Sequence, residues 1–171
     1  MPSMSLAAII SRDLRTLRLE IEAYPAEVAI WDTPPGLPNS AGVLARHVCG
    51  NLRHFVGRVM GNHDYRRDRP AEFESPPIPR EALLAELAAT ETAVTAALGG
   101  LSAERLTERY PVIVDGQELS TGDFLIHLAV HLGFHLGQVD YHRRTVTGNK
   151  LSVAPMAIPE LASARPGRNA G

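Results

Sequence analysis

The chain has 171 residues, a length that one hydrophobic core can organise, so we expect a single folded domain. Apolar residues make up 44% of the sequence and charged residues 21%, which is near the globular average and argues against disorder and against a coiled coil. The formal net charge is -2, so there is no strong basic field, and nucleic acid is not expected as a partner. Arg66, Arg67 and Arg69 cluster, but two aspartates lie among them, so we interpret this run as a solvated loop.

Cys49 is the single cysteine, and it cannot form a disulfide within one chain. The sequence shows no leader peptide and no run of roughly 18 or more apolar residues that would span a bilayer. We therefore expect a cytoplasmic protein that has no membrane partner. The histidines are the unusual feature of the composition, because four of the seven lie between positions 127 and 142.

Two amphipathic helices are predicted in the first third of the chain. Residues 4–24 place leucine and isoleucine at intervals of three and four, which is typical of a helix with one apolar face. A group of prolines between positions 25 and 38 then interrupts the helical pattern. A second helix is expected to start after an Asn39 or Ser40 cap and to run to about Met60, and it carries His47.

The middle of the chain combines a long connection, a third helix and a turn. Residues 61–79 are polar, charged and rich in proline, so we interpret them as a crossover or a lid. A third helix is predicted over residues 80–98, where two glycines end it. Residues 109–119 alternate around Asp115 and Gly116, a strong hairpin signal, so we expect a small β-hairpin there.

A fourth helix is expected to start at a Ser120 or Thr121 cap and to continue toward Arg144, carrying the histidine cluster. Four helices of about twenty residues, with one hairpin before the last, predict an all-α fold that is a four-helix bundle. We expect this domain to cover residues 1–150, and residues 151–171 to form an extended or frayed tail.

His127, His131 and His135 fall in one column of the fourth helix, because four residues return a side chain to nearly the same face. Imidazoles at i and i+4 can bind one metal ion together, as they do in zinc-binding helices. Three in a column cannot all reach one ion, so if the last two are ligands, His127 lies on the substrate side. His142 is two turns beyond His135 and too far to join. On the second helix, His47 has the matching place at the edge of the core and can face the pair.

A histidine at the edge of a core is often a hydrogen-bonded structural residue. Spacing alone therefore leaves two interpretations of His131 and His135 open, metal ligation and a purely structural role. For His54, His63 and His142 we favour a structural or surface role. Cys49, two residues from His47, points to a different face of the helix and is not expected to be a nucleophile.

Residues 127–138, which read HLAVHLGFHLGQ, resemble the signature of DinB-like proteins, in which a histidine pair at i and i+4 precedes one residue and then Gly-Gln. Residues 40–47 similarly resemble the stretch around the first metal ligand of that family. The resemblance covers roughly residues 5–145. It implies a bundle of up-down-down-up connection that is usually a homodimer. The metal ligands that it implies are His47, His131 and His135.

One departure from the family pattern lies beside the last ligand. Many members carry a histidine just before that ligand and an arginine just after it, whereas this chain has Phe134 and Leu136. The three ligand positions are intact. A cation is missing from their neighbourhood, so we do not infer an anionic substrate.

Three imidazole ligands leave an ion free to bind water or substrate, which is the arrangement of catalytic rather than structural zinc. A divalent transition metal would lower the pKa of a bound water or activate a thiolate; zinc is the first expectation, and nickel or iron are the alternatives. The resemblance implies thiol chemistry, because characterised relatives include S-transferases and isomerases that use mycothiol or bacillithiol. We therefore expect a small-molecule transferase or hydrolase, and the alternative is a non-catalytic, stress-related metal-binding dimer.

Three further residues are candidates for supporting roles around the metal. His127 is the best-placed group for acid-base or substrate contact. Gln138 and Asp140 are candidate partners that would orient a ligand ring from outside the coordination shell.

Overall fold

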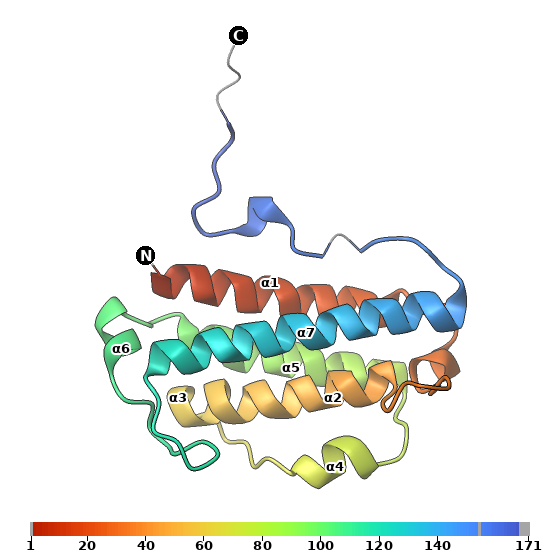
Figure 1. Cartoon of the computed structure of the whole chain (residues 1–171), viewed down its shortest axis with the longest axis horizontal. Coiled ribbons are helices and arrows are strands. Elements are labelled where there is room, and N and C mark those ends of the chain that lie inside the picture. The colour runs from red at the N-terminus through yellow and green to blue at the C-terminus, as the bar shows by residue number, and fades with distance from the viewer. Residues whose placement is uncertain (1, 154, 168–171) are drawn as a thin grey trace.

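The structure of the chain is a computed structural model, in which residues 2–153 and 155–167 are described. The regular elements of the described residues are all helices, with no strand among them, which confirms the predicted all-α class. Four long helices lie side by side (Figure 1), namely α1 (Pro2–Glu22), α2 (Ala41–Leu52), α5 (Arg80–Leu98) and α7 (Thr121–Thr147). The α1 helix packs against α5 and α7, and α2 packs against the same two helices. A single 3-10 turn, η1 (Glu27–Ile30), follows α1.

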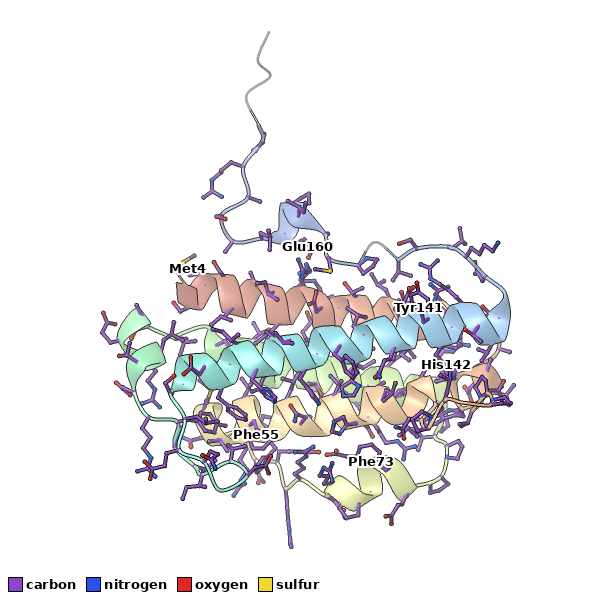
Figure 2. The ribbon with its side chains drawn as sticks, in the orientation of Figure 1. Met4, Phe55, Phe73, Tyr141, His142 and Glu160 are labelled. Atoms are coloured by element: carbon purple, nitrogen blue, oxygen red, sulfur yellow. The ribbon has the colours of Figure 1, made fainter. Side chains whose placement is uncertain are left out.

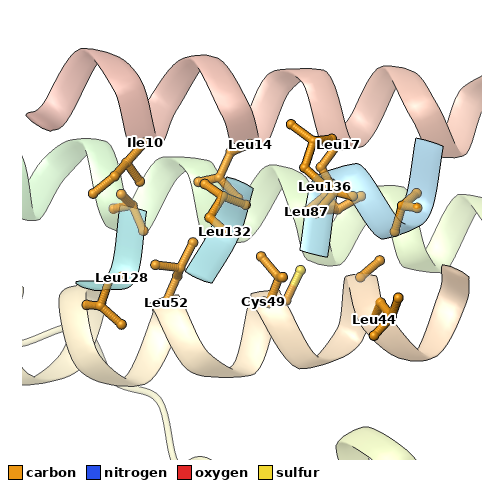
Figure 3. Packing of buried hydrophobic residues seen from close by; sticks show 14 of the residues in the cluster. Ile10, Leu14, Leu17, Leu44, Cys49, Leu52, Leu87, Leu128, Leu132 and Leu136 are labelled. Atoms are coloured by element: carbon orange, nitrogen blue, oxygen red, sulfur yellow. The ribbon is translucent and has the colours of Figure 1, made fainter. Parts of the chain in front are cut away.

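The hydrophobic core lies between these four helices, and each of them contributes buried aliphatic side chains (Figure 3). Leu14 of α1, Leu87 of α5 and Leu132 of α7 are each at most 2% exposed. Burying a leucine side chain contributes roughly 1.5–3 kcal/mol, so the apolar stripes seen in the sequence are what hold the helices together. The bundle therefore forms along the periodicity that the sequence displays.

The second predicted helix continues to about Met60, but its geometry changes on the way. Ser40 caps α2 by accepting a hydrogen bond from the backbone N–H of Val43, at 3.3 Å. After α2 the chain widens into a π-helical segment, η2 (Arg53–Arg58), and then tightens again as α3 (Val59–Gly61). Within η2 the carbonyl oxygen of Phe55 accepts a hydrogen bond from the Tyr110 hydroxyl. Short π-helical segments of this kind are frequent near functional sites.

The predicted crossover, residues 61–79, contains a short helix that the sequence pattern did not indicate. This helix, α4 (Arg69–Glu74), starts at Asp68, whose side chain accepts a hydrogen bond from the N–H of Ala71. Pro70 lies in its first turn, where a missing N–H is tolerated. The α4 helix packs on α2, so the crossover covers that helix as an ordered segment.

The chain reversal before α7 forms without the expected pair of strands. A second unpredicted short helix, α6 (Ala103–Thr107), comes first. Asp115 and Gly116 make the turn, with φ angles of 47° and 77° that suit a tight hairpin. Between the described arms there are only two isolated bridges, Arg109 to Ser120 and Val114 to Gln117. Pro111 has no N–H to pair with the other arm, and Val112 and Ile113 are both exposed, so this arm does not keep the alternation that a paired strand needs.

At the other end of α7 the chain turns back over the bundle. Gly148 ends the helix with a φ of 67°. A 3-10 turn, η3 (Ile158–Glu160), then lies near α1 (Figure 1), and Glu160 pairs with Arg15 of α1. The described part of the predicted tail is therefore partly docked, and residues 168–171 lie outside the described residues. None of the described helices combines the length and the apolar character needed to cross a bilayer.

A buried ion pair ties α1 to α7. Arg143 and Glu20 have fully buried side chains, and the guanidinium also donates to Asp140. The backbone carbonyls of Asn149 and Leu151 accept the remaining hydrogen bonds of Arg143. Removing one partner of such a pair is expensive, because it leaves the other charge in the interior without compensation.

We expect Glu20→Ala to lower the free energy of unfolding by about 3 kcal/mol, near the low end for a broken buried pair because Asp140 still holds Arg143. Glu22→Ala is the matched control, since Glu22 pairs with Arg18 at the surface of the same helix and should contribute at most about 1 kcal/mol. Urea denaturation followed by circular dichroism measures both values. Equal values for the two variants would contradict the prediction.

Candidate metal centre

The structure brings together the three histidines that the sequence selected as metal ligands. His47 on α2 faces His131 and His135 on α7, and one ligand atom from each lies within 4.8 Å of the others. The Nε2 atoms of His47 and His131 are 3.2 Å apart, and those of His131 and His135 are 3.1 Å apart. Two nitrogens bound at zinc distance in a tetrahedral site would be about 3.3 Å apart. The separations therefore suit one shared divalent ion.

The hydrogen bonds on the far side of two rings fix which nitrogen faces the centre. The Nδ1 atom of His47 lies 2.9 Å from a carboxylate oxygen of Glu72, and that of His135 lies 2.7 Å from Oε1 of Gln138. Both oxygens are acceptors, so each Nδ1 carries the proton and each Nε2 keeps its lone pair. Both lone pairs approach Nε2 of His131, and a neutral ring has at most one proton to place there. A cation among the three nitrogens satisfies all of them.

Burial keeps the two imidazoles of α7, His131 and His135, in the form that binds metal. The pKa of His131 is lowered to about 4, first because burial disfavours the charged ring and then because His135 and His47 are close. Burial also lowers the pKa of His135, and the hydrogen bond to Gln138 opposes the shift only in part. Neutral imidazole is the ligand that a divalent metal requires.

Glu72 and Arg67, which support His47, were not found by sequence reasoning. Arg67 donates to both oxygens of Glu72, at 2.7 and 3.0 Å, and its side chain is only 12% exposed. The interpretation of the arginine run as a solvated loop is therefore wrong for Arg67. Burial alone would raise the pKa of Glu72, but the hydrogen bonds from His47 and Arg67 outweigh it, so the pKa is lowered and the carboxylate is ionised. The one relevant sequence signal is the capping Asp68 and the proline after it, which place Glu72 in a first helical turn.

Aromatic rings border the centre on two sides. Phe73 extends from α4 toward α2 (Figure 2), and its ring centroid is 4.9 Å from that of His47. His127, the candidate for substrate contact, is exposed and stacks between Phe124 and His131, with ring centroids 5.9 and 6.2 Å away. It lies one helical turn from the cluster, as the spacing predicted. A small cavity of about 110 Å³ adjoins the other side of the centre, next to His135 and Gln138.

The structure does not bring Asp140 to the histidines. Its carboxylate accepts hydrogen bonds from Arg143 and Arg144. Five residues after His135 is about 500° of helical rotation, which turns Asp140 toward a different face from the ligands. Gln138, three residues after His135, remains close enough to contact it.

The remaining histidines and the single cysteine lie outside the three-histidine cluster. His142 is buried, with Nδ1 2.7 Å from the Tyr24 hydroxyl and Nε2 2.8 Å from the carbonyl of Asp32. His63 is exposed, and His54 lies in the π-helical segment. Cys49 is buried in the core, and burial raises the pKa of its thiol to about 12. A thiol in this environment is a poor nucleophile.

The fold and the site together define the class of this protein. It is a helical bundle with a candidate metal centre, formed where three imidazoles from two helices meet at the edge of the core. The model of one family, the DinB superfamily, matches residues 11–139, a span that contains all three histidines. The chain belongs to the DinB superfamily. No curated protein and no solved structure matches it.

We expect the protein, purified without added metal or an affinity tag, to bind about one equivalent of a divalent transition metal per chain. His131→Ala should weaken the affinity for Zn²⁺ more than about 100-fold, since a lost ligand costs more than a lost outer partner. His127→Ala, one turn away on the same helix, should change it less than about threefold. Elemental analysis and competition with a chromogenic chelator measure these values. Unchanged binding by His131→Ala would show that the metal lies elsewhere.

Proposed function

We propose that this chain is a metal-dependent enzyme that transfers a low-molecular-weight thiol to a small electrophile, or that hydrolyses a small molecule at the same centre. The observation that carries the proposal is the convergence of three Nε2 atoms from His47, His131 and His135. The cluster found among the described residues contributes three ligands, so an ion held there keeps a position for water or substrate. A divalent metal, with zinc as the first choice and nickel or iron as alternatives, would supply the Lewis acidity that activates a water or a thiol.

The residues around the centre have separable tasks in this proposal. Glu72 and Gln138 hold two ligand rings in the orientation that turns Nε2 inward. His127 is exposed beside His131, so it can exchange a proton with a bound substrate and with solvent. Asn51, one helical turn from His47 on α2, is 8% exposed, and its Oδ1 has no hydrogen-bond partner in the described part of the chain. This amide is a candidate for binding a polar group of the substrate.

The family connection of the bundle, up-down-down-up, is part of the proposal. Following the chain by colour in Figure 1, α1 and α7 start at one end of the molecule, and α2 and α5 start at the other. The crossover between α2 and α5 runs back along α2 through α4, which lets two consecutive long helices point the same way. In this connection α2 and α7 are neighbouring helices that run in opposite directions, so histidines on their facing sides can meet.

Thiol consumption tests the proposed chemistry. Metal-loaded protein incubated with mycothiol, bacillithiol or glutathione and a panel of electrophiles should consume one thiol in a protein-dependent reaction. His47→Ala should lower that rate at least about 100-fold, because it removes a ligand. His63→Ala, an exposed histidine of the crossover, is the control and should retain the rate. Full activity in His47→Ala would reject catalysis at this centre.

The alternative function is a non-catalytic, stress-related metal-binding dimer. It predicts metal binding and a metal-dependent rise in melting temperature, with no thiol consumed and no substrate hydrolysed.

Both functions use a homodimer, which we infer from the family and from the outer face of α7. There Ile126, Val130 and Tyr141 are 52%, 66% and 75% exposed, and they line an apolar cavity of about 800 Å³ between α1, α7 and the tail. Gly133 and Gly137 also line it and have open space at the position of a Cβ, so a second α7 can approach closely.

Light scattering tests the dimer. We expect a mass of about twice 18.5 kDa at micromolar concentration. Val130→Glu should shift the protein to monomer, because it places a charge in the proposed apolar contact. Val28→Glu, a change at an equally exposed valine of η1, should leave the mass unchanged. A wild-type protein that is monomeric throughout this range would reject the dimer.

A further inference from the structure

One carboxylate of the crossover reaches the back of a ligand ring. Glu72 is 5% exposed, and its Oε2 lies 2.9 Å from Nδ1 of His47. An ionised carboxylate only accepts hydrogen bonds, so this contact requires the proton of His47 to be on Nδ1. The other nitrogen, Nε2, is then free of a proton and directed at His131.

Besides its contact with His47, the carboxylate of Glu72 is held by Arg67. Arg67 donates through Nε and Nη2 to both oxygens, a paired arrangement that fixes the plane of the carboxylate as well as its position. The Arg67 guanidinium in turn lies over the ring of Phe55, 5.5 Å from its centroid. On the next residue of α4, Phe73 packs against the imidazole of His47. The short helix therefore contacts His47 through both an apolar and a charged side chain.

Gly50 makes room for the carboxylate. A Cβ at this position would lie 2.0 Å from Oε1 of Glu72, well inside any permitted contact. Glycine inside a helix is unfavourable relative to alanine, so the sequence accepts a weaker helix at this point. The close approach of Glu72 to α2 gives that glycine a physical reason.

We propose that Glu72, clamped by Arg67 and admitted by Gly50, is a positioning residue that presents His47 to the metal. The inference rests on the proposed metal centre. Carboxylates that orient a ligating histidine and raise its basicity are a general feature of metal sites, and losing one typically weakens metal binding 10- to 100-fold. Because Glu72 belongs to the crossover, metal binding at His47 and docking of α4 on α2 stabilise each other.

Gln138 and Glu72, the two residues that contact the outer nitrogens of His135 and His47, come from different parts of the chain. Gln138 comes from the same helix as its ligand, three residues away, so α7 supplies it without further folding. Glu72 is 25 residues from His47 and arrives only when the crossover packs on α2. Of these two contacts, the one to His47 therefore depends on tertiary structure.

Cobalt binding tests the positioning role. Affinity for Co²⁺ and the visible absorption of the bound ion are measured for the wild type and for Glu72→Ala, Glu72→Gln and Gly50→Ala. We expect a 10- to 100-fold loss of affinity and a changed spectrum for Glu72→Ala. Glu72→Gln keeps an acceptor for the Nδ1 proton and should recover part of the loss. Gly50→Ala keeps every polar group but displaces the carboxylate, so it should resemble Glu72→Ala.

Glu74→Ala is the matched control, because Glu74 is an exposed glutamate on the same short helix. It should bind Co²⁺ within about threefold of the wild type, with the same spectrum. Thermal melts of Glu72→Ala and Gly50→Ala without metal measure the cost of each change to folding separately from its effect on metal affinity.

Three outcomes would overturn the inference. Wild-type affinity and spectrum in both Glu72→Ala and Gly50→Ala, with one equivalent bound, would reject the positioning role and leave the metal centre standing. A loss of Co²⁺ affinity in Gly50→Ala alone, with a lowered metal-free melting temperature and with wild-type affinity in Glu72→Ala, would assign the effect to folding. A wild type that binds no Co²⁺ would reject the metal centre itself, and the inference with it.

Discussion

Three imidazole nitrogens from two helices lie within 4.8 Å of one another, close enough to share one ion, and this convergence depends on how the two helices are held together. Side chains on α7 can come together by helical spacing alone, but His47 reaches them only if α2 keeps one axial position relative to α7. The buried leucines of both helices maintain that position, because sliding either helix by one turn would expose apolar surface. The geometry of the three imidazoles therefore rests on ordinary core packing.

Periodic features of the sequence were sufficient for the long helices and for the shared face of His131 and His135, whereas the choice of His47 as a third ligand came from the family resemblance. His131 and His135 are local neighbours on one helix, so their proximity follows from spacing, and Gln138 follows in the same way. Glu72 and Arg67 could not be found like this, because charged residues in a proline-rich segment look solvated until tertiary packing brings them to α2. The turn at Asp115 was predictable from its own residues. The strands beside it did not form, because Pro111 has no N–H to pair and the alternation is lost at the exposed Val112 and Ile113.

The positive charge nearest to His47 in the described contacts comes from the crossover and not from α7. Phe134 and Leu136 flank His135, so α7 provides no cation directly beside it. The crossover brings one instead, the guanidinium of Arg67, but Glu72 neutralises it through paired hydrogen bonds. A molecule that approaches the centre therefore meets imidazole, aromatic and amide groups more than an unpaired positive charge. For the proposed transfer reaction, this environment favours a neutral or weakly polar electrophile.

The π-helical segment η2 (Arg53–Arg58) divides one continuous helix into two parts with separate rotational phases. Before it, α2 presents His47 to α7. After it, Gly61 lies against α5 so closely that a Cβ would be 2.7 Å from that of Ala97. Gly57, inside the π-helical segment, is also close to α5, where a Cβ would be 3.2 Å from that of Ala93. An uninterrupted α-helix would have to compromise between the two contacts. The widened turn changes the rotational phase between the two parts, so that His47 can face α7 while Gly61 faces α5.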